Sequence, residues 1–401
     1  MSLDYAVLSS DAQVSQYARV LSHSFGRTEE EAAKWIGRYD RRDVRVLSDQ
    51  ASGTVVAGLI VLPMGQYFGG RSVPKWGIAA VGVAPEARGH GAATELMSRI
   101  VVEMHERGIP ISGLYPATQA LYRRAGYEQG GARFEIRMPL CRIDSRRRDL
   151  AVRAADEKDH GRVRGLYAKV AAHCDGALDR GDMQWDRILR PPPSRVDPAR
   201  AFVAVGVGGE VEGWVYLMQA LGAPRGKHEV VVHDIGFTSR DVGLRLLAFL
   251  AGYATMGTDL VMYGGSSSPI LMLLGEQPFS FAFGDYWMTR ITAIGPALGA
   301  RGYPHGLAGS LAFEVEDDVV PGNTGVWELH VEGGTGRAER ATSAGRHLVV
   351  RADIRGFATM FTGFQSPWAL SRLGLIQGSD EALAMAGAMF GGHAPAMADF
   401  Y

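Results

Sequence analysis

The stretch VAPEARGHGAATELM, residues 83–97, places two glycines and an arginine where a β-rich run gives way to a helix. The run before it, WGIAAVGV at residues 76–83, stops at Pro85. Apolar residues after it recur three and four positions apart, which predicts an amphipathic helix ending near Gly108. The apolar positions are Ala92, Ala93, Leu96, Met97, Ile100, Val101 and Met104. A strand followed by a helix requires neither glycine, so the loop needs a separate explanation.

The loop has the composition of an anion-binding site. A helix N-terminus presents unpaired backbone N–H groups and the positive end of the helix dipole, which together attract phosphate. Gly89 and Gly91 remove side chains that would obstruct a bulky diphosphate, and Arg88 adds a cation. The alternative is that both glycines only permit a tight turn from strand to helix. The loop by itself does not separate these two interpretations.

Composition limits the classes of function. The 401 residues carry 42 Lys and Arg against 43 Asp and Glu, and no long basic run stands beside aromatic residues. This balance argues against a nucleic-acid partner. A chain of this length fits two or three domains with a substantial buried core.

Two features predict a cytoplasmic protein with no membrane contact. The N-terminal residues MSLDYAVLSSDAQ lack a basic segment and an apolar stretch of signal-peptide length, and Arg245 interrupts the apolar run VGLRLLAFLAGYATMG. Cys141 and Cys174 lie far apart without metal-ligand spacing. We expect both to be small buried residues in a reducing compartment, with no metal site.

Three blocks are expected, at residues 1–145, 146–290 and 291–401. Short strand and helix patterns alternate in the first, which ends in the charged segment CRIDSRRRDLAVRAADEKD. The third opens with GSLAFEVEDDVVPGNTGVWELHVEGG, where alternating apolar residues on both sides of a Pro-Gly-Asn turn predict a hairpin of an α+β unit.

The second block repeats the order of the first. HEVVVHDIGFTSRDVGLRLLAFLAGYATMGTDLVMYG, residues 228–264, reads as strand, turn, helix and strand, like residues 75–115. Its turn, FTSRD, has no glycine pair. We interpret this as an internal duplication that kept the architecture and lost the special loop. Two unrelated α/β units remain the alternative, because such units are common.

The pattern Arg88-x-x-Gly91-x-Ala93, between a β run and an amphipathic helix, resembles the acetyl-CoA-binding motif of the GNAT acetyltransferases. It lacks the Lys-Ser/Thr pair of a Walker loop and the third glycine of a Rossmann fingerprint. The three-block layout, together with VWELHV, FTGFQSPWALSRLGLI and the ending APAMADFY, resembles the enhanced intracellular survival (Eis) family of multi-acetylating aminoglycoside acetyltransferases. That resemblance implies an α/β and α+β protein with tandem GNAT-fold domains and a sterol-carrier-like C-terminal domain.

The same resemblance implies roles for individual residues. Tyr122, in ALYRRAGY, matches the general acid of the family, and the chain-terminal carboxylate on Tyr401 matches its general base. Phe25 and Trp35 match positions that line the substrate cavity. The residues implied to bind acetyl-CoA are Val81, Gly82, Val83, Arg88, Gly89, His90, Gly91, Ala92, Ala93, Thr94, Ala117 and Thr118. The peptide groups of Val81 and Val83 would pair with the pantetheine arm, and the amides from Gly89 to Thr94 would hold the pyrophosphate.

Each of these residues also has a purely structural interpretation. A helical tyrosine such as Tyr122 is commonly a core residue, and Tyr401 could be a frayed terminus. Phe25 and Trp35 could be ordinary core, and His90 a solvated side chain. The loop has fewer arginines than the Eis segment, and Ser24 stands where an acid would attract a polycation.

The sequence therefore predicts an N-acetyltransferase that moves acetyl from acetyl-CoA to a primary amine without a metal. Aminoglycosides are the first expected substrate, followed by polyamine-like molecules and lysine side chains. The resemblance also implies a homo-hexamer. The competing hypothesis is an acyl-CoA-sensing or lipid-binding protein that uses the sterol-carrier-like block.

Overall fold

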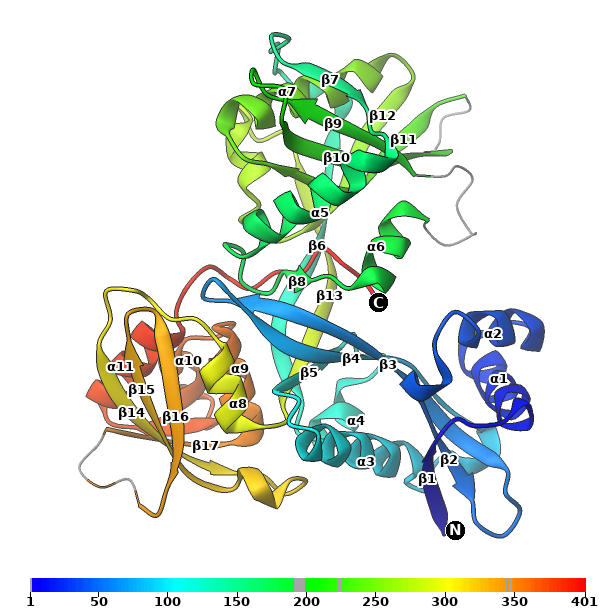
Figure 1. Cartoon of the computed structure of the whole chain (residues 1–401), viewed down its shortest axis with the longest axis vertical. Coiled ribbons are helices and arrows are strands. Elements are labelled where there is room, and N and C mark those ends of the chain that lie inside the picture. The colour runs from blue at the N-terminus through cyan, green and yellow to red at the C-terminus, as the bar shows by residue number, and fades with distance from the viewer. Residues whose placement is uncertain (1, 191–198, 222–225, 344, 346–347) are drawn as a thin grey trace.

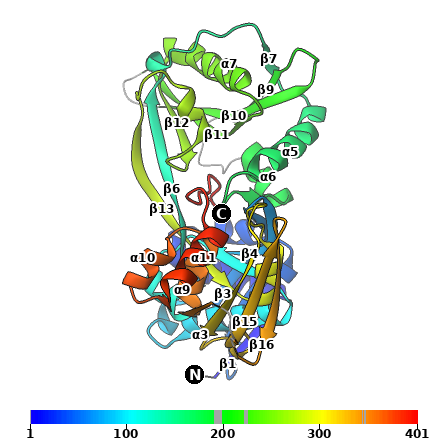
Figure 2. The ribbon, with the colours of Figure 1, turned by 90° about the vertical axis from the view of Figure 1, so that its left-hand side faces the viewer.

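The computed structural model describes residues 2–190, 199–221, 226–343, 345 and 348–401. Figure 1 shows three parts, with the second above and the first and third side by side below it. The last residues of the chain run to the centre, where the three parts meet (Figures 1 and 2). The chain end is therefore placed among all three parts.

The first part is a mixed sheet with four helices. Its strands are β1 (Leu3–Val7), β2 (Val44–Asp49), β3 (Val55–Phe68), β4 (Arg71–Val83), β5 (Ile111–Leu114) and β6 (Glu128–Pro139). Its helices are α1 (Asp11–Phe25), α2 (Glu29–Ile36), α3 (Ala92–Glu106) and α4 (Gln119–Arg124). The helix predicted after the glycine loop is confirmed as α3, and Thr28 caps α2 as its position before three acids predicts.

The second part repeats this order of elements. Its strands are β7 (Ala151–Ala154), β8 (Leu178–Asp179), β9 (Arg200–Val205), β10 (Val211–Leu221), β11 (His228–Phe237), β12 (Gly257–Gly264) and β13 (Ser280–Ile291). Its helices are α5 (Glu157–Ala171), α6 (Asp182–Leu189) and α7 (Arg240–Ala251). The predicted strand, turn, helix and strand of residues 228–264 are confirmed as β11, α7 and β12, with β11 parallel to β12.

One continuous sheet joins the first two parts. Its order is β1-β2-β3-β4-β5-β13-β6-β12-β11-β10-β9-β7, with β8 added to β3. Strand β13 lies between β5 and β6, and β6 in turn pairs with β12. Because β6 pairs with β12 and β13 of the second part, and β13 pairs with β5 and β6 of the first, the sheet has no break at the expected boundaries near residues 145 and 290, and those boundaries stay a prediction.

The third part is a separate five-stranded sheet covered by helices. Its strands are β14 (Gly309–Glu316), β15 (Gly325–Glu332), β16 (Thr335–Ala341), β17 (Val349–Asp353) and β18 (Ile376–Gly378). Its helices are α8 (Ile294–Ala300), α9 (Ile354–Thr362), α10 (Pro367–Arg372) and α11 (Asp380–Phe390). The predicted hairpin is confirmed, since β14 and β15 pair antiparallel.

The first and third parts share one hydrophobic core, which also includes residues of β8 and β13, and two further clusters lie mainly in the second part. Two ion pairs reinforce the shared contact. Arg290 on β13 binds Asp317 at 2.7 Å with both side chains fully buried, and Arg355 on α9 binds Glu128 on β6 at 2.7 Å. None of the helices in the described ranges combines the length and apolar character needed to cross a bilayer.

Candidate active site

Strands β4 and β5 separate and leave an opening between them. They run parallel and pair only through Lys75–Gly77 and Ile111–Gly113. Beyond this point β4 continues beside β3 to Val83, while β5 ends beside β13. Within the described residues, the edge of β4 that faces β5 thus has no strand partner from Ile78 onward. Such an edge can accept an extended ligand as if it were an added strand.

A bulge lies on that free edge. Ala80 and Val81 together stand opposite the single residue Leu59 of β3. Ala80 has a φ of 53°, and no other non-glycine residue in the described ranges has a positive φ. The hydroxyl of Tyr17 donates a hydrogen bond of 2.6 Å to the Ala80 carbonyl and holds it in place. Bulges and strained residues of this kind concentrate beside active sites, where they redirect backbone groups.

The glycine loop keeps the N-terminus of α3 open. Gly89 and Gly91 have φ values of 79° and 83°, the left-handed region that favours glycine. A Cβ at either position would meet no atom within 4 Å, so packing within the protein does not require these glycines. No side chain caps α3, whose N-cap residue is Gly91, and Arg88 and His90 are exposed beside it. The first amides of α3 are thus free to bind an anion.

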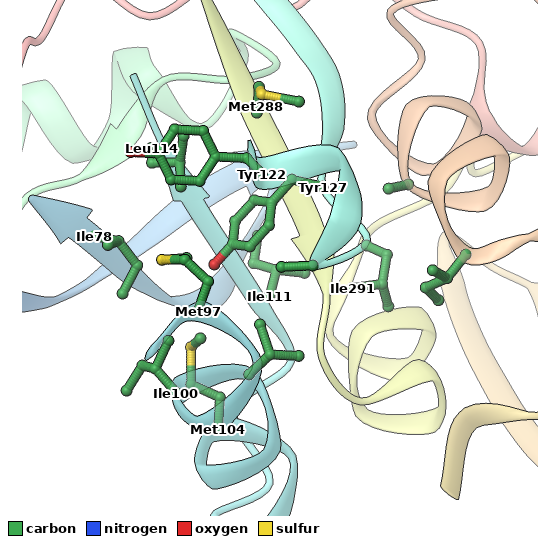
Figure 3. Close-up of a cluster of buried hydrophobic side chains, with 14 of the residues drawn as sticks. Ile78, Met97, Ile100, Met104, Ile111, Leu114, Tyr122, Tyr127, Met288 and Ile291 are labelled. Carbon is green, nitrogen blue, oxygen red and sulfur yellow. The ribbon is translucent and has the colours of Figure 1, made fainter. Parts of the chain in front are cut away.

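Tyr122 lies in a buried cluster with Leu114 of β5 (Figure 3). It belongs to α4, its side chain is 5% exposed, and its ring meets that of Tyr127 edge-on at 6.2 Å. Figure 3 shows both rings in the cluster that includes Ile78, Met97 and Leu114. Burial raises the pKa of Tyr122 to about 12, so the phenol holds its proton at neutral pH. The Tyr127 hydroxyl is already bound to that of Ser112 at 2.8 Å.

Tyr401 reaches the point where β4 and β5 separate. The residue is 8% exposed, and its ring lies so close to Gly77 that a Cβ there would be 2.8 Å from Cε2 of the tyrosine. Its ring also meets that of Tyr115, just after β5, at 5.7 Å. Burial, then Tyr127 and Asp399, raises the pKa of the Tyr401 hydroxyl. The docked position excludes the interpretation of Tyr401 as a frayed residue.

Polar contacts from two parts of the molecule hold the segment before Tyr401. The Tyr115 hydroxyl donates to the Asp399 carbonyl at 2.6 Å, and Arg133 Nε donates to the Ala398 carbonyl at 3.1 Å. Arg180, which follows β8, binds the Asp399 carboxylate at 2.9 Å and the Asp234 carboxylate at 2.8 Å. Since the Arg180 side chain is 2% exposed, this ion network is buried. It ties the last residues of the chain to the second part.

Sequence reasoning missed Lys75, the buried residue beneath Tyr401. Its Nζ donates to Gln66 Oε1 at 3.1 Å and lies 5.1 Å from the centre of the Tyr401 ring. Burial lowers the pKa of Lys75 to about 7, while the charge of Asp399 acts in the opposite direction. A single lysine in a β-rich run gives no local signal of burial, because one cannot tell from it which face of the strand is covered.

The remaining predicted residues are wholly or partly exposed. Ala117 and Thr118 are exposed at the start of α4. Phe25 is 45% exposed and meets the ring of Trp35 edge-on at 5.3 Å, and the guanidinium of Arg27 lies over Trp35. A cavity of about 490 Å³ beside Tyr401 is lined by Arg27, and neither Phe25 nor Trp35 is among its lining residues.

The expectation that both cysteines are buried is wrong for one of them. Cys141 is exposed, because it lies in a short 3-10 turn after β6, and Cys174 is half-buried. No group of three or more His, Cys, Asp or Glu side chains in the described ranges is placed to hold a metal ion.

Comparisons with known proteins agree with this architecture. Two family models described as acetyltransferase (GNAT) domains match residues 8–130 and 176–291, and a sterol carrier protein domain matches residues 294–398. A Streptomyces coelicolor protein named as an uncharacterized N-acetyltransferase is 28% identical over 317 residues, which cover 72% of each chain.

Solved structures extend the likeness over the whole chain. A GCN5-related N-acetyltransferase from Anabaena variabilis is 30% identical, with a TM-score of 0.92 and full coverage of both chains. The match to Eis1 from Mycobacterium abscessus covers both chains fully with a TM-score of 0.77. At 19% identity, this likeness shows a shared fold.

Proposed function

The chain belongs to the GCN5-related N-acetyltransferases, which use acetyl-CoA, and from that premise we propose which groups carry the reaction and which amine accepts the acetyl group. The observation that carries the proposal is the position of the last residues, with Tyr401 seated where β4 and β5 separate and near Tyr127, whose ring meets that of Tyr122. An acid and a base are both needed there, because the attacking amine loses a proton and the leaving sulfur gains one.

The opening fits acetyl-CoA, which supplies the activated acetyl thioester. We place its pantetheine arm along the free edge of β4, where the peptide groups of Val81 and Val83 have no partner strand on that side. The uncapped N-terminus of α3, with Gly89, Gly91 and Arg88, takes the pyrophosphate. Amides that no side chain caps are ready to bind without rearrangement.

Tyr122 is the proposed acid. Its phenol has a pKa of about 12 and keeps the proton that the leaving sulfur needs. A phenol of that pKa protonates an exposed thiolate poorly, since a free thiol has a pKa of about 8.5. Burial in the same opening raises the pKa of the thiol as well, so that the pKa values of the phenol and the thiol differ less.

The proposed base is the main-chain carboxylate of Tyr401, and this role requires that the chain ends at that residue. Carboxylates are weak bases in water, with a pKa of about 3.5 at a chain terminus. A carboxylate that loses part of its hydration on binding of the amine becomes a stronger base, which favours removal of a proton from the amine.

Primary amines are the proposed acceptors, and the aminoglycosides implied by the resemblance to Eis stay a prediction, as do the homo-hexamer and the cytoplasmic location. The lipid-binding alternative has less support. The interior of the third part is filled by fully buried Phe313, Phe357, Phe361 and Phe390. Arg301, also buried, donates to the carbonyls of the last two.

Thiol release from acetyl-CoA tests the chemistry, with kanamycin, spermidine and a lysine peptide as acceptors. Tyr122→Phe is expected to lower kcat by about 10²- to 10⁴-fold, the range for loss of a general acid. Tyr127→Phe is the matched control, because it removes a hydroxyl from the neighbouring ring that is bound to Ser112 instead of facing the opening. Equal kcat values in the two variants would remove Tyr122 from the mechanism.

Extension of the chain past Tyr401 tests the base. An added alanine converts the carboxylate into a peptide bond and is expected to abolish most turnover while acetyl-CoA binding persists. Full activity in the extended protein would assign the base elsewhere. No thiol release with any of the amines, despite acetyl-CoA binding, would favour the sensor hypothesis.

A further inference from the structure

The cavity of about 490 Å³ beside Tyr401 lies where an amine could approach the proposed base. Its wall comes from the loop after α1, from α6, from the strands β6, β11, β12 and β13, and from the last residues of the chain. Figures 1 and 2 show the chain end beside α6. The charged side chains in the wall, apart from His233, are Arg27, Arg133, Arg187, Asp285 and Asp399. Cations therefore outnumber carboxylates among these side chains.

Both carboxylates already have cationic partners. Asp399 is bound by Arg180 at 2.9 Å, from outside the cavity wall. Asp285 lies 3.7 Å from the guanidinium of Arg133, which also donates to the Ala398 carbonyl. The charge of each carboxylate is therefore already compensated by an arginine other than Arg27 and Arg187.

Two arginines of the wall are left without an ion pair. Arg27 is exposed, with its guanidinium over the ring of Trp35 at 5.3 Å. Arg187 is half-buried in the last turn of α6. Across the ranges that the structure describes, no carboxylate lies within 4.0 Å of either guanidinium. A guanidinium in this state binds carboxylates and phosphates through two parallel hydrogen bonds.

We propose that the acceptor is a primary amine that also carries an anionic group, a carboxylate or a phosphate, which Arg27 and Arg187 bind while the amine faces Tyr401. This inference rests on the proposed function, because it assigns the substrate class of the same site. A polycation would bring further positive charges towards both arginines, and juxtaposed like charges weaken binding. The cavity thus favours an anionic amine over an aminoglycoside.

Matched pairs of amines test the charge preference by thiol release from acetyl-CoA. The pairs are glycylglycine against glycylglycinamide and glucosamine 6-phosphate against glucosamine, with kanamycin as the polycation. In at least one pair the member with the anionic group is expected to have a KM about tenfold lower than the member without it, as for one hydrogen bond to a charged group. The pair that shows the effect distinguishes a carboxylate from a phosphate.

Substitutions locate the preference. Arg27→Gln and Arg187→Gln are each expected to raise the KM of the anionic amine about tenfold and to leave the neutral amine and acetyl-CoA unchanged. Arg190→Gln is the control, since Arg190 follows α6 on the exposed side and pairs with Asp186. The double variant with Arg27→Glu and Arg187→Glu is expected to shift the preference towards kanamycin.

Calorimetric titration of the CoA-loaded protein separates a wrong substrate class from wrong chemistry. One outcome is that the protein binds the anionic amines without any turnover and that Arg187→Gln abolishes this binding. That outcome would support the anion site and overturn the proposed reaction. Turnover with no difference within either pair, or a preference of the unaltered protein for kanamycin, would overturn the anion site alone. Equal binding of charged and neutral amines would do the same.

Discussion

The two acetyltransferase-like parts of this chain share one architecture and differ at one helix end. In the first, α3 begins at Gly91 without a side-chain cap. In the second, Ser239 caps α7 by accepting a hydrogen bond from the Val242 amide, and Asp241 adds a negative charge in the first turn. A capped and acidic helix start repels a pyrophosphate, whereas an open one binds it.

The second part uses its own strand opening for the end of the chain. Strands β11 and β12 pair from His228 to Val232, and a cavity of about 300 Å³ lies where they separate. Its wall includes Ala394, Ala396 and Asp399 of the last segment. In the proposed function, one copy of the fold presents the cofactor site, and the other anchors the segment that completes that site.

The largest expected effect is in the anchoring part. Arg180→Met leaves Asp234 and Asp399 buried without their cation, which should lower the free energy of unfolding by about 3–5 kcal/mol and release the last segment. Urea unfolding and kcat measure the two consequences. Arg164→Met, at an exposed pair with Asp182, is the control. Restored stability after neutralising both aspartates would tie the loss to the uncompensated charges.

The next effect concerns the open helix start. Gly91→Ala should raise the KM for acetyl-CoA about tenfold, since a Cβ there occupies the space proposed for the diphosphate. The left-handed backbone of this residue should add about 1 kcal/mol of strain to the folded variant. Gly108→Ala is a matched control at the other end of α3, with a φ of 68° and nothing within 4 Å of its Cβ. Equal KM values for the two variants would contradict a phosphate site at α3.

A smaller effect is expected at the capped helix start. Ser239→Ala removes the side-chain cap of α7 and should lower the free energy of unfolding by about 1 kcal/mol. The KM for acetyl-CoA should stay unchanged, because the proposed cofactor site lies at α3. A change in that KM after removal of the cap would contradict the proposed difference in cofactor binding between α3 and α7.

The smallest net effect is expected at Lys75. Between its folded pKa of about 7 and its ordinary value of 10.5, the unfolded chain binds the extra proton, so stability rises with pH in that window. Lys75→Met should remove this rise. The free energy of unfolding at pH 7 should change little, because two effects offset each other. The substitution removes the cost of burying a charged lysine, but it leaves Gln66 Oε1 without its hydrogen-bond donor. Urea unfolding at several pH values, with exposed Lys34→Met as control, measures the slope.

Much of the fold could be predicted because its signals are local. The helix after the glycine loop, the hairpin of the third part and the repeated order of elements each depend on patterns within a few tens of residues. The pairing of β6 with β13 could not be predicted, since the sequence of a strand does not specify which distant strand pairs with it. The loop, Tyr122 and the last tyrosine were found through a motif, and their catalytic roles stay a prediction.

The sequence by itself determined the open helix start, because the left-handed φ values of Gly89 and Gly91 are a property of those residues. It also determined the class of the fold. Only the tertiary structure decided where the chain ends and what surrounds it. Arg180 and Asp399 lie 219 residues apart, and the arginines around the acceptor cavity come from separate elements. Charge and burial at that cavity arise from packing between distant segments, and local sequence does not encode such packing.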